Sequence, residues 1–234
     1  IVEAAFPKAD ITIDVFHVIK NQCDTLDELR MRFKRKAISE QGKEKAEFNK
    51  AKKRRKKARE YYRKTHPRKR GENRGRKRKR ANKQFKPNEL ANGDTKVELF
   101  TRARHILSKS GEKWSESQKT RAELVFGFAP QIRKAHSLVC KLRCIFKNKK
   151  LSKETAREKL KVWYKEVSES NIKELIAAKR TLKAKEEDVL NYFVNHATNA
   201  AAESLNAKMK GVRSELRGVR DLPFYLYRCT MIFG

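Results

Sequence analysis

The chain has 234 residues, with 60 Lys and Arg against 28 Asp and Glu, and therefore a formal net charge of +32. This excess of basic side chains favours a polyanionic partner, either a nucleic acid or an anionic membrane surface, and charge alone does not separate the two. Membrane insertion is disfavoured because the chain has no run of about 18 or more apolar residues.

The four cysteines do not form a recognisable disulfide or metal framework. Cys140 and Cys144 lie one helical turn apart, but no other Cys or His has the close spacing of a zinc site. We therefore predict four reduced, partly buried thiols and a cytoplasmic location.

The first patterned stretch is residues 1–18, IVEAAFPKADITIDVFHV. Within it, residues 10–14 alternate polar and apolar side chains, which predicts a short strand with Ile11 and Ile13 buried. Asp14 would end that strand just before a long helical pattern. It is therefore either an acidic site residue or the N-cap of the helix, and the local pattern leaves both roles open. His17 follows one turn later, where a lone His is more often structural than functional.

A helical pattern runs from Val15 to about Arg63. In its first half, apolar side chains recur at helical spacing and are predicted to face a core: Val18, Ile19, Cys23, Leu26, Leu29, Phe33 and Ile38. Beyond Gln41 this apolar stripe nearly disappears. The second half is therefore predicted either to project from the fold or to become ordered on binding.

The most biased segment is residues 52–83, which contains 19 Lys or Arg and two acidic residues, a net charge of +17. Such a tract neutralises phosphates and gives strong, salt-dependent binding with little sequence preference. We predict that it contacts the DNA backbone, although a charged loop that only keeps the chain soluble has the same composition. The predicted DNA-binding residues of the tract are Lys52, Lys53, Arg54, Arg55, Lys56, Lys57, Arg68, Lys69, Arg70, Arg74, Arg76, Lys77, Arg78, Lys79 and Arg80.

After a turn at residues 92–94, helical stripes continue to about His196 and predict a helical bundle. Residues 115–118, Ser-Glu-Ser-Gln, form a capping box that starts one helix, and Pro130 starts the next. Trp163 lies within an apolar stripe, which favours core packing, whereas Trp114 beside the predicted cap is given no role. The other residues predicted to be buried from Pro130 onward are Ile132, Ala135, Val139, Leu142, Phe146, Ala156, Leu160, Val167, Ile172, Leu175, Ile176 and Leu182.

Residues 198–234, TNAAAESLNAKMKGVRSELRGVRDLPFYLYRCTMIFG, predict a helix capped by Thr198, followed by a short C-terminal helix at Pro223 whose aromatic residues are expected to be buried. Leu205, Met209, Val212 and Leu216 form the apolar stripe of the first helix, and Glu203 lies on its polar side. Glu203 is then either a metal-holding carboxylate or a solvated residue paired with Lys210 or Arg213. The basic and amide residues predicted here to contact DNA are Asn199, Asn206, Lys208, Lys210 and Arg213.

Taken together, the two ends resemble a family. FPKADITIDVFHV is similar to a D-x-F-H-V segment, and TNAAAESLNAKMKGVRSELRGVRD to an N-x-x-x-E-x-x-N-x-K-x-K segment, of one group of bacterial insertion-sequence transposases of the Asp-Asp-Glu type. The resemblance implies an RNase H-like catalytic domain with a long helical insertion before the Glu. It implies that Asp14 and Glu203 are catalytic and metal-holding residues, and that His17 belongs to the motif.

The resemblance also implies two Mg²⁺ ions, transposon-end and target DNA as partners, and a possible homo-oligomer. The family's first Asp lies upstream of the D-x-F-H-V segment, so we expect the chain to be the C-terminal portion of a transposase that is inactive alone and needs an N-terminal part. The competing interpretation is a nonenzymatic basic helical protein that binds DNA or RNA.

The predicted fold class is mainly α, a helical insertion bundle attached to a partial RNase H-like α/β core. Residues 1–20 would be a remnant of that core, 21–95 a long helix and basic tract, 96–196 the insertion bundle, and 197–234 the return to the core.

Overall fold

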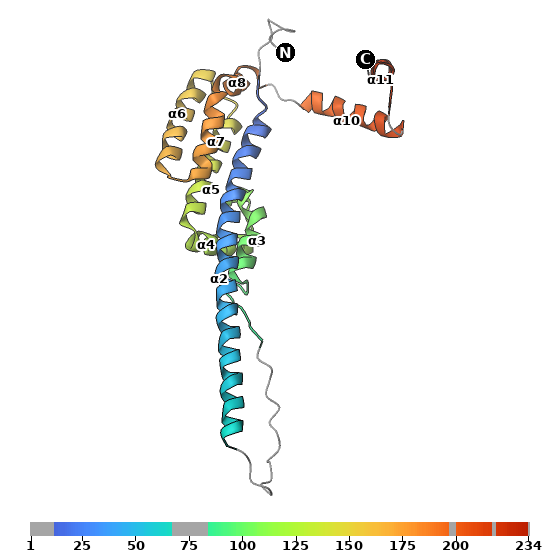
Figure 1. The fold of residues 1–234 in the computed structure, drawn as a ribbon. Helices are drawn as coiled ribbons and strands as arrows, with labels where there is room; N and C mark the ends of the chain where they lie inside the picture. The colour runs from blue at the N-terminus through green and yellow to red at the C-terminus, as the bar shows by residue number, and fades with distance from the viewer. Residues whose placement is uncertain (1–11, 67–83, 197–199, 217–218, 234) are drawn as a thin grey trace. The chain divides into compact units, whose positions relative to one another are not determined.

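The computed structural model describes residues 12–66, 84–196, 200–216 and 219–233, which are almost entirely helical (Figure 1). This confirms the predicted mainly α class. The helices are α2 (Val15–Thr65), α3 (Lys96–Leu107), a 3-10 turn (Gly111–Lys113), α4 (Glu116–Phe128), α5 (Pro130–Lys147), α6 (Lys153–Glu169), α7 (Lys173–Ala184), α8 (Glu186–Leu190), α9 (Tyr192–Asn195), α10 (Ala200–Glu215) and α11 (Leu222–Phe233).

The described residues contain no β-strand, only an isolated bridge between Glu89 and Thr95. Of the strand predicted at residues 10–14, Asp10 and Ile11 lie outside the described residues, and residues 12–14 are not paired as a strand. Ile13 instead donates its backbone N–H to the carbonyl of Asp188, at 3.0 Å, and is half-buried. The segment before α2 is thus attached to α8 by its backbone.

The chain divides into two compact units, one of residues 1–22 and 138–234 and the other of residues 23–137. Helices α2 and α5 each supply residues to both units. The domain boundaries predicted from the sequence, 1–20, 21–95, 96–196 and 197–234, stay predictions.

The unit of residues 23–137 is built on α3 and α4, which pack against each other beside the first half of α2. Capping boxes at Thr95 and Ser115 start the two helices, and the Ser115 box confirms the sequence prediction. Arg30 of α2 is 4% exposed, and its guanidinium donates to the carbonyl of Phe100 at 2.8 Å. Because that carbonyl belongs to α3, a buried charged hydrogen bond joins the two helices.

The predicted buried face of α2 is confirmed in part. Val18, Leu26 and Leu29 are buried, and Ile19, Cys23 and Phe33 are half-buried. Ile38 is 49% exposed, and Ala37 is buried in its place. At about 100° per residue, Ala37 follows Phe33 by four positions and stays on the stripe, whereas Ile38 turns away from it. The prediction for Ile38 was wrong because it allowed a five-residue step.

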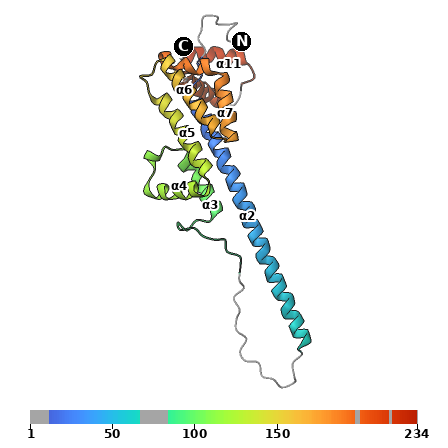
Figure 2. The same ribbon diagram turned by 90° about the vertical axis from the view of Figure 1, so that its left-hand side faces the viewer.

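The second half of α2 has no buried residue after Ala37, and residues 49–65 are all exposed. It continues as an unbroken helix beyond α3 in Figure 2. This confirms that the buried stripe ends near Gln41, and the helix projects from its own unit.

The unit of residues 1–22 and 138–234 has its core on α5, α6 and α7, and α8 and α9 pack against α6. Every residue predicted to be buried on α5 and α6 is buried, and the Trp163 indole N–H donates to the carbonyl of Leu138 at 2.8 Å. The prediction that Trp163 is a core residue is therefore confirmed. In the α7 region, Ile172, Leu175 and Leu182 are buried as predicted, and Ile176 is half-buried.

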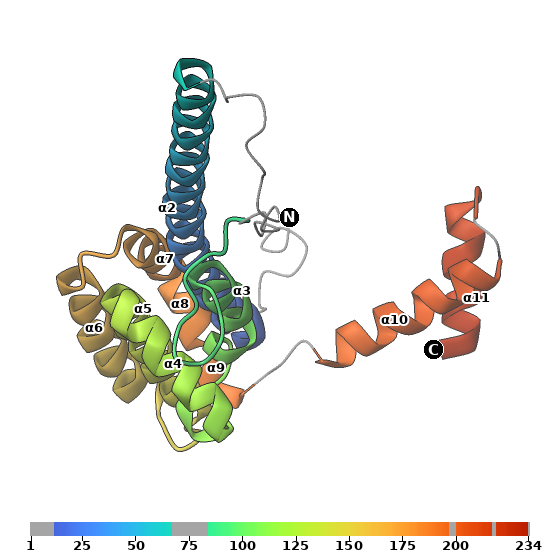
Figure 3. The ribbon, with the colours of Figure 1, turned by 90° about the horizontal axis from the view of Figure 1, so that it is seen from below.

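The last two helices, α10 and α11, lie against each other in Figure 3. The Tyr225 hydroxyl donates to the carbonyl of Met209 at 2.6 Å, and Tyr225 and Cys229 are buried. The expected burial of the aromatic residues of α11 is otherwise not seen, since Phe224 and Tyr227 are 56% and 60% exposed. The apolar stripe of α10 is also only partly covered, with Leu205 45% exposed.

Candidate functional site

Asp14 is the N-cap of α2. Its carboxylate Oδ1 accepts the backbone N–H of Phe16 at 2.7 Å, and its carbonyl accepts the N–H groups of His17 and Val18. The cap role left open by the sequence is therefore real. It also fixes the carboxylate at the start of the helix, half-buried, with the exposed His17 one turn further on.

The structure brings the two sequence motifs together. His17 Nε2 lies 3.8 Å from Glu203 Oε1, and each side chain is 57% exposed. This separation is too long for a hydrogen bond, so the contact is electrostatic and is favourable when the imidazole is protonated. Glu203 is in the first turn of α10. The acid of the second motif thus lies beside the histidine that follows Asp14.

Glu203 shares a helix face with polar and basic residues. Asn206, Lys210 and Arg213 follow at three-, seven- and ten-residue steps and are all exposed. Lys208 lies on another face, with its ammonium 5.9 Å from the centre of the Phe233 ring. Thr198 and Asn199, predicted to cap α10 and to contact DNA, lie outside the described residues.

The predicted backbone-binding tract is described only in part. Lys52, Lys53, Arg54, Arg55, Lys56 and Lys57 lie on the exposed second half of α2. The remaining tract residues, Arg68, Lys69, Arg70, Arg74, Arg76, Lys77, Arg78, Lys79 and Arg80, lie outside the described residues. Tyr61 and Tyr62 are 71% and 63% exposed on the same helix, and Tyr62 stacks on the His66 ring.

Comparison with protein families gives a match to a transposase family. The family model of DDE transposases of the ISL3 group, described as transposase, matches residues 1–86 and 73–229. The chain belongs to the ISL3 group of DDE transposases. The matched segments contain both Asp14 and Glu203. Searches of curated proteins and of solved structures found no match.

Membership of this transposase family makes DNA the partner of the chain and DNA transposition its general function. None of the described helices combines the length and the apolar character needed to cross a bilayer. Because DNA is the partner that family membership implies, the exposed basic residues of α2 are candidates for DNA contact.

DDE transposases use divalent metal ions, and the carboxylates of Asp14 and Glu203 are hard oxygen donors of the type that such ions prefer. Within the described part of the chain, however, no group of three or more acidic, His or Cys side chains could hold a metal ion. Asp14 and Glu203 thus fit the donor type that a divalent ion prefers.

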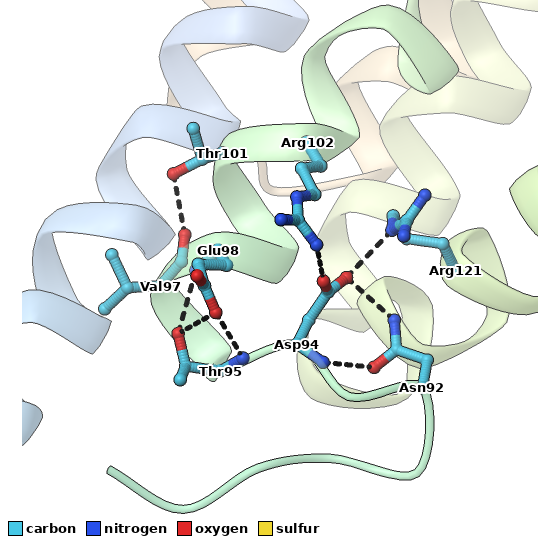
Figure 4. A network of polar contacts seen from close by, with 8 residues as sticks. All are labelled: Asn92, Asp94, Thr95, Val97, Glu98, Thr101, Arg102 and Arg121. Atoms are coloured by element: carbon cyan, nitrogen blue, oxygen red, sulfur yellow. Dashed lines mark hydrogen bonds and ion pairs between the residues drawn. The ribbon is translucent and has the colours of Figure 1, made fainter. Parts of the chain in front are cut away.

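A buried acid elsewhere in the transposase has a different role. Asp94 is 1% exposed, and its carboxylate accepts hydrogen bonds from Arg102, from Arg121 at 2.9 Å and from the Asn92 amide at 2.8 Å (Figure 4). Burial raises the pKa of Asp94, but the hydrogen bond and charge of Arg121, with the charge of Arg102, outweigh it, and the pKa is lowered. Asp94 is therefore a structural anion that ties the turn at residues 90–94 to α3 and α4.

The sequence predicts the turn but not this network. Gly93 has φ of 76°, as expected for a glycine turn, but the Arg102 and Arg121 partners come from two other helices. Trp114, to which the sequence assigns no role, is a similar case. Its indole N–H donates to the carbonyl of Ile106 at 2.9 Å, and its ring lies 5.1 Å from that of His136. Trp114 therefore contributes to the packing of its unit.

Proposed function

We propose that Asp14 and Glu203 are two of the three acids of a DDE active site, which cleaves DNA and joins strands during transposition. The observation that carries this proposal is the contact between His17 and Glu203. These residues belong to motifs at opposite ends of the chain, and Glu203 has no Lys or Arg three or four residues away in sequence with which it could form a local ion pair.

The cap geometry gives Asp14 a fixed position. Its hydrogen bond from the N–H of Phe16 holds the carboxylate at the N-terminus of α2. His17 then holds Glu203 close to this end of α2. We assign His17 as a positioning residue, acting through Glu203.

A pair of divalent ions would complete this site, and Mg²⁺ is the ion that suits its oxygen donors. When bound, such ions activate the attacking oxygen and stabilise the leaving oxygen. Asp14 and Glu203 would hold them. We propose that the third carboxylate comes from an RNase H-like core to which the N-terminal part of the transposase contributes. With two carboxylates, we expect the chain by itself to bind DNA without cleaving it.

DNA binding in this proposal rests on exposed cations. Lys52–Lys57 form a run of six basic residues on a helix that has no buried residue in this region. Such a surface contacts phosphates of any sequence. Asn206, Lys210 and Arg213 form a second polar and basic surface, on the face of α10 that carries Glu203, where the strand to be cut would lie.

The experiment that tests the proposal measures the binding and cleavage of labelled duplex DNA by the purified chain, with and without Mg²⁺, over a series of salt concentrations. We expect an affinity that falls steeply with salt and no strand cleavage. Absence of DNA binding at low salt would contradict the DNA-binding part of the proposal. Mg²⁺-dependent cleavage that survives Asp14→Asn and Glu203→Gln would contradict the assignment of the acids.

A further inference from the structure

A small cavity opens beside the candidate site, between the start of α2 and the α7–α8 region. Its volume is about 160 Å³. Its apolar wall is made by Ile13, Val18, Leu182 and Val189. A cavity of roughly 150 Å³ with apolar walls takes one aromatic ring of the size of benzene. Size and lining therefore suit a single flat ring.

One polar atom in this lining has no partner. Gln22 is 1% exposed, and its side-chain Oε1 has no hydrogen-bond donor among the described residues. Buried acceptors in folded proteins are almost always satisfied, because desolvating them without a donor is unfavourable. The Gln22 Oε1 can therefore accept a hydrogen bond from a ligand in the cavity that supplies an N–H or O–H group.

The rim of the cavity differs from its wall. It carries His17, Asn21 and Lys185, all exposed. Lys185 adds a cation, and His17 is the residue that contacts Glu203. A ligand seated in the cavity would thus have an anionic group favoured at the rim beside Lys185.

We infer that this cavity receives one unpaired pyrimidine base of the DNA strand held at the candidate site; the inference rests on the proposed function. A pyrimidine is a single ring, its faces suit the aliphatic wall, and its phosphate would lie toward Lys185. Cytosine N4–H or thymine N3–H would donate to Gln22 Oε1. A two-ring purine is larger than the single ring that a cavity of about this volume takes.

An apolar side chain from another protein segment would also fill the wall, but it would leave Gln22 Oε1 without a donor. The need for a hydrogen-bond donor to Gln22 Oε1 therefore favours a base over an apolar side chain as the occupant of the cavity. The same reasoning makes Gln22 the residue to change, because Gln22→Met keeps the length of the side chain and removes the acceptor. Since the acceptor is unsatisfied in the folded chain, we expect Gln22→Met to fold with unchanged or higher thermal stability.

The test measures affinities by fluorescence anisotropy for three duplexes that differ at one position: fully paired, with one bulged thymidine, and with one bulged adenosine. We expect the whole chain to bind the thymidine bulge most tightly. Gln22→Met should reduce that preference by about three- to tenfold, as for loss of one hydrogen bond, and leave the affinity for paired duplex unchanged. Gln41→Met, a partly exposed glutamine on the same helix outside this cavity, is the matched control and should keep the preference.

The outcomes separate the two proposals. If no duplex binds, DNA binding by the chain fails and this inference fails with it. If all three duplexes bind equally, or if the preference for the thymidine bulge survives Gln22→Met, DNA binding stands and the base pocket is refuted. A cavity that is filled by a polypeptide segment of the complete transposase would also refute the base pocket.

Discussion

At the scale of single residues, acids of this transposase differ in what surrounds their oxygens. Asp94 is enclosed by Arg102, Arg121 and Asn92, and its pKa is lowered. Asp14 and Glu203 lie at helix starts, half-buried and exposed. A buried and fully paired carboxylate suits structure, whereas an accessible carboxylate can reach a substrate or an ion.

We expect Asp94→Asn to lower the free energy of unfolding by about 2 kcal/mol, because it removes charged hydrogen bonds to two arginines. Thermal or denaturant unfolding of the variant measures this. Asp24→Asn, an exposed acid on α2 in the same unit, is the control and should have little effect. Equal stabilities for Asp94→Asn and the parent chain would show that the network contributes nothing.

The lowered pKa of Asp94 also gives a pH dependence. Its folded-state pKa lies below the ordinary value of 3.8, so this carboxylate stabilises the fold above that pH. The contribution is lost as the pH falls through the folded-state pKa. We expect the stability difference between Asp94→Asn and the parent chain to be constant near neutral pH and to shrink in acid; a difference that grows in acid would contradict this sign.

At the scale of elements, the exposed half of α2 carries the clearest prediction about DNA. Lys53 and Lys57 lie one turn apart on its surface. We expect the Lys53→Gln and Lys57→Gln double variant to bind all duplex sequences more weakly. Its slope of log affinity against log salt should flatten by about 0.9 for each phosphate that is no longer neutralised.

The matched control for this prediction is the double variant Lys159→Gln and Lys165→Gln, two exposed lysines on α6. It removes the same charge from a helix outside the predicted DNA surface, so its salt slope should stay closer to that of the parent chain. Equal flattening by the two double variants would show that net charge, rather than the exposed half of α2, decides affinity.

The pairing of α10 with α11 depends on Tyr225, whose hydroxyl donates to the carbonyl of Met209. We expect Tyr225→Phe to increase hydrogen exchange in α11, because the helix has few other buried residues. Tyr227→Phe changes an exposed tyrosine two positions away and should have no effect. Equal exchange in all three proteins would mean that the hydrogen bond does not hold the pair.

At the scale of the whole molecule, the helices could be predicted well because each apolar stripe is local. The Ser115 capping box, the Pro130 start and the buried face of α5 all follow from spacing along the chain. The polar networks could not be predicted because their partners are far apart in sequence, as for Arg30 with Phe100. For the candidate site, the motif residues could be named from the sequence, but the contact between His17 and Glu203 and the orphaned Gln22 depend on the three-dimensional fold.

The proposal that Asp14 and Glu203 serve catalysis, rather than DNA affinity, can be tested in cells. The measurement is the transposition frequency of an element encoding the complete transposase, for Asp14→Asn, Glu203→Gln and the control Glu215→Gln, an exposed acid of the same helix α10. Each purified variant is also assayed for duplex affinity. We expect the first two substitutions to reduce transposition by at least about 100-fold with DNA affinity unchanged, and Glu215→Gln to be neutral. Transposition that persists in Glu203→Gln, or a decrease matched by an equal decrease in DNA affinity, would contradict a catalytic role for these acids.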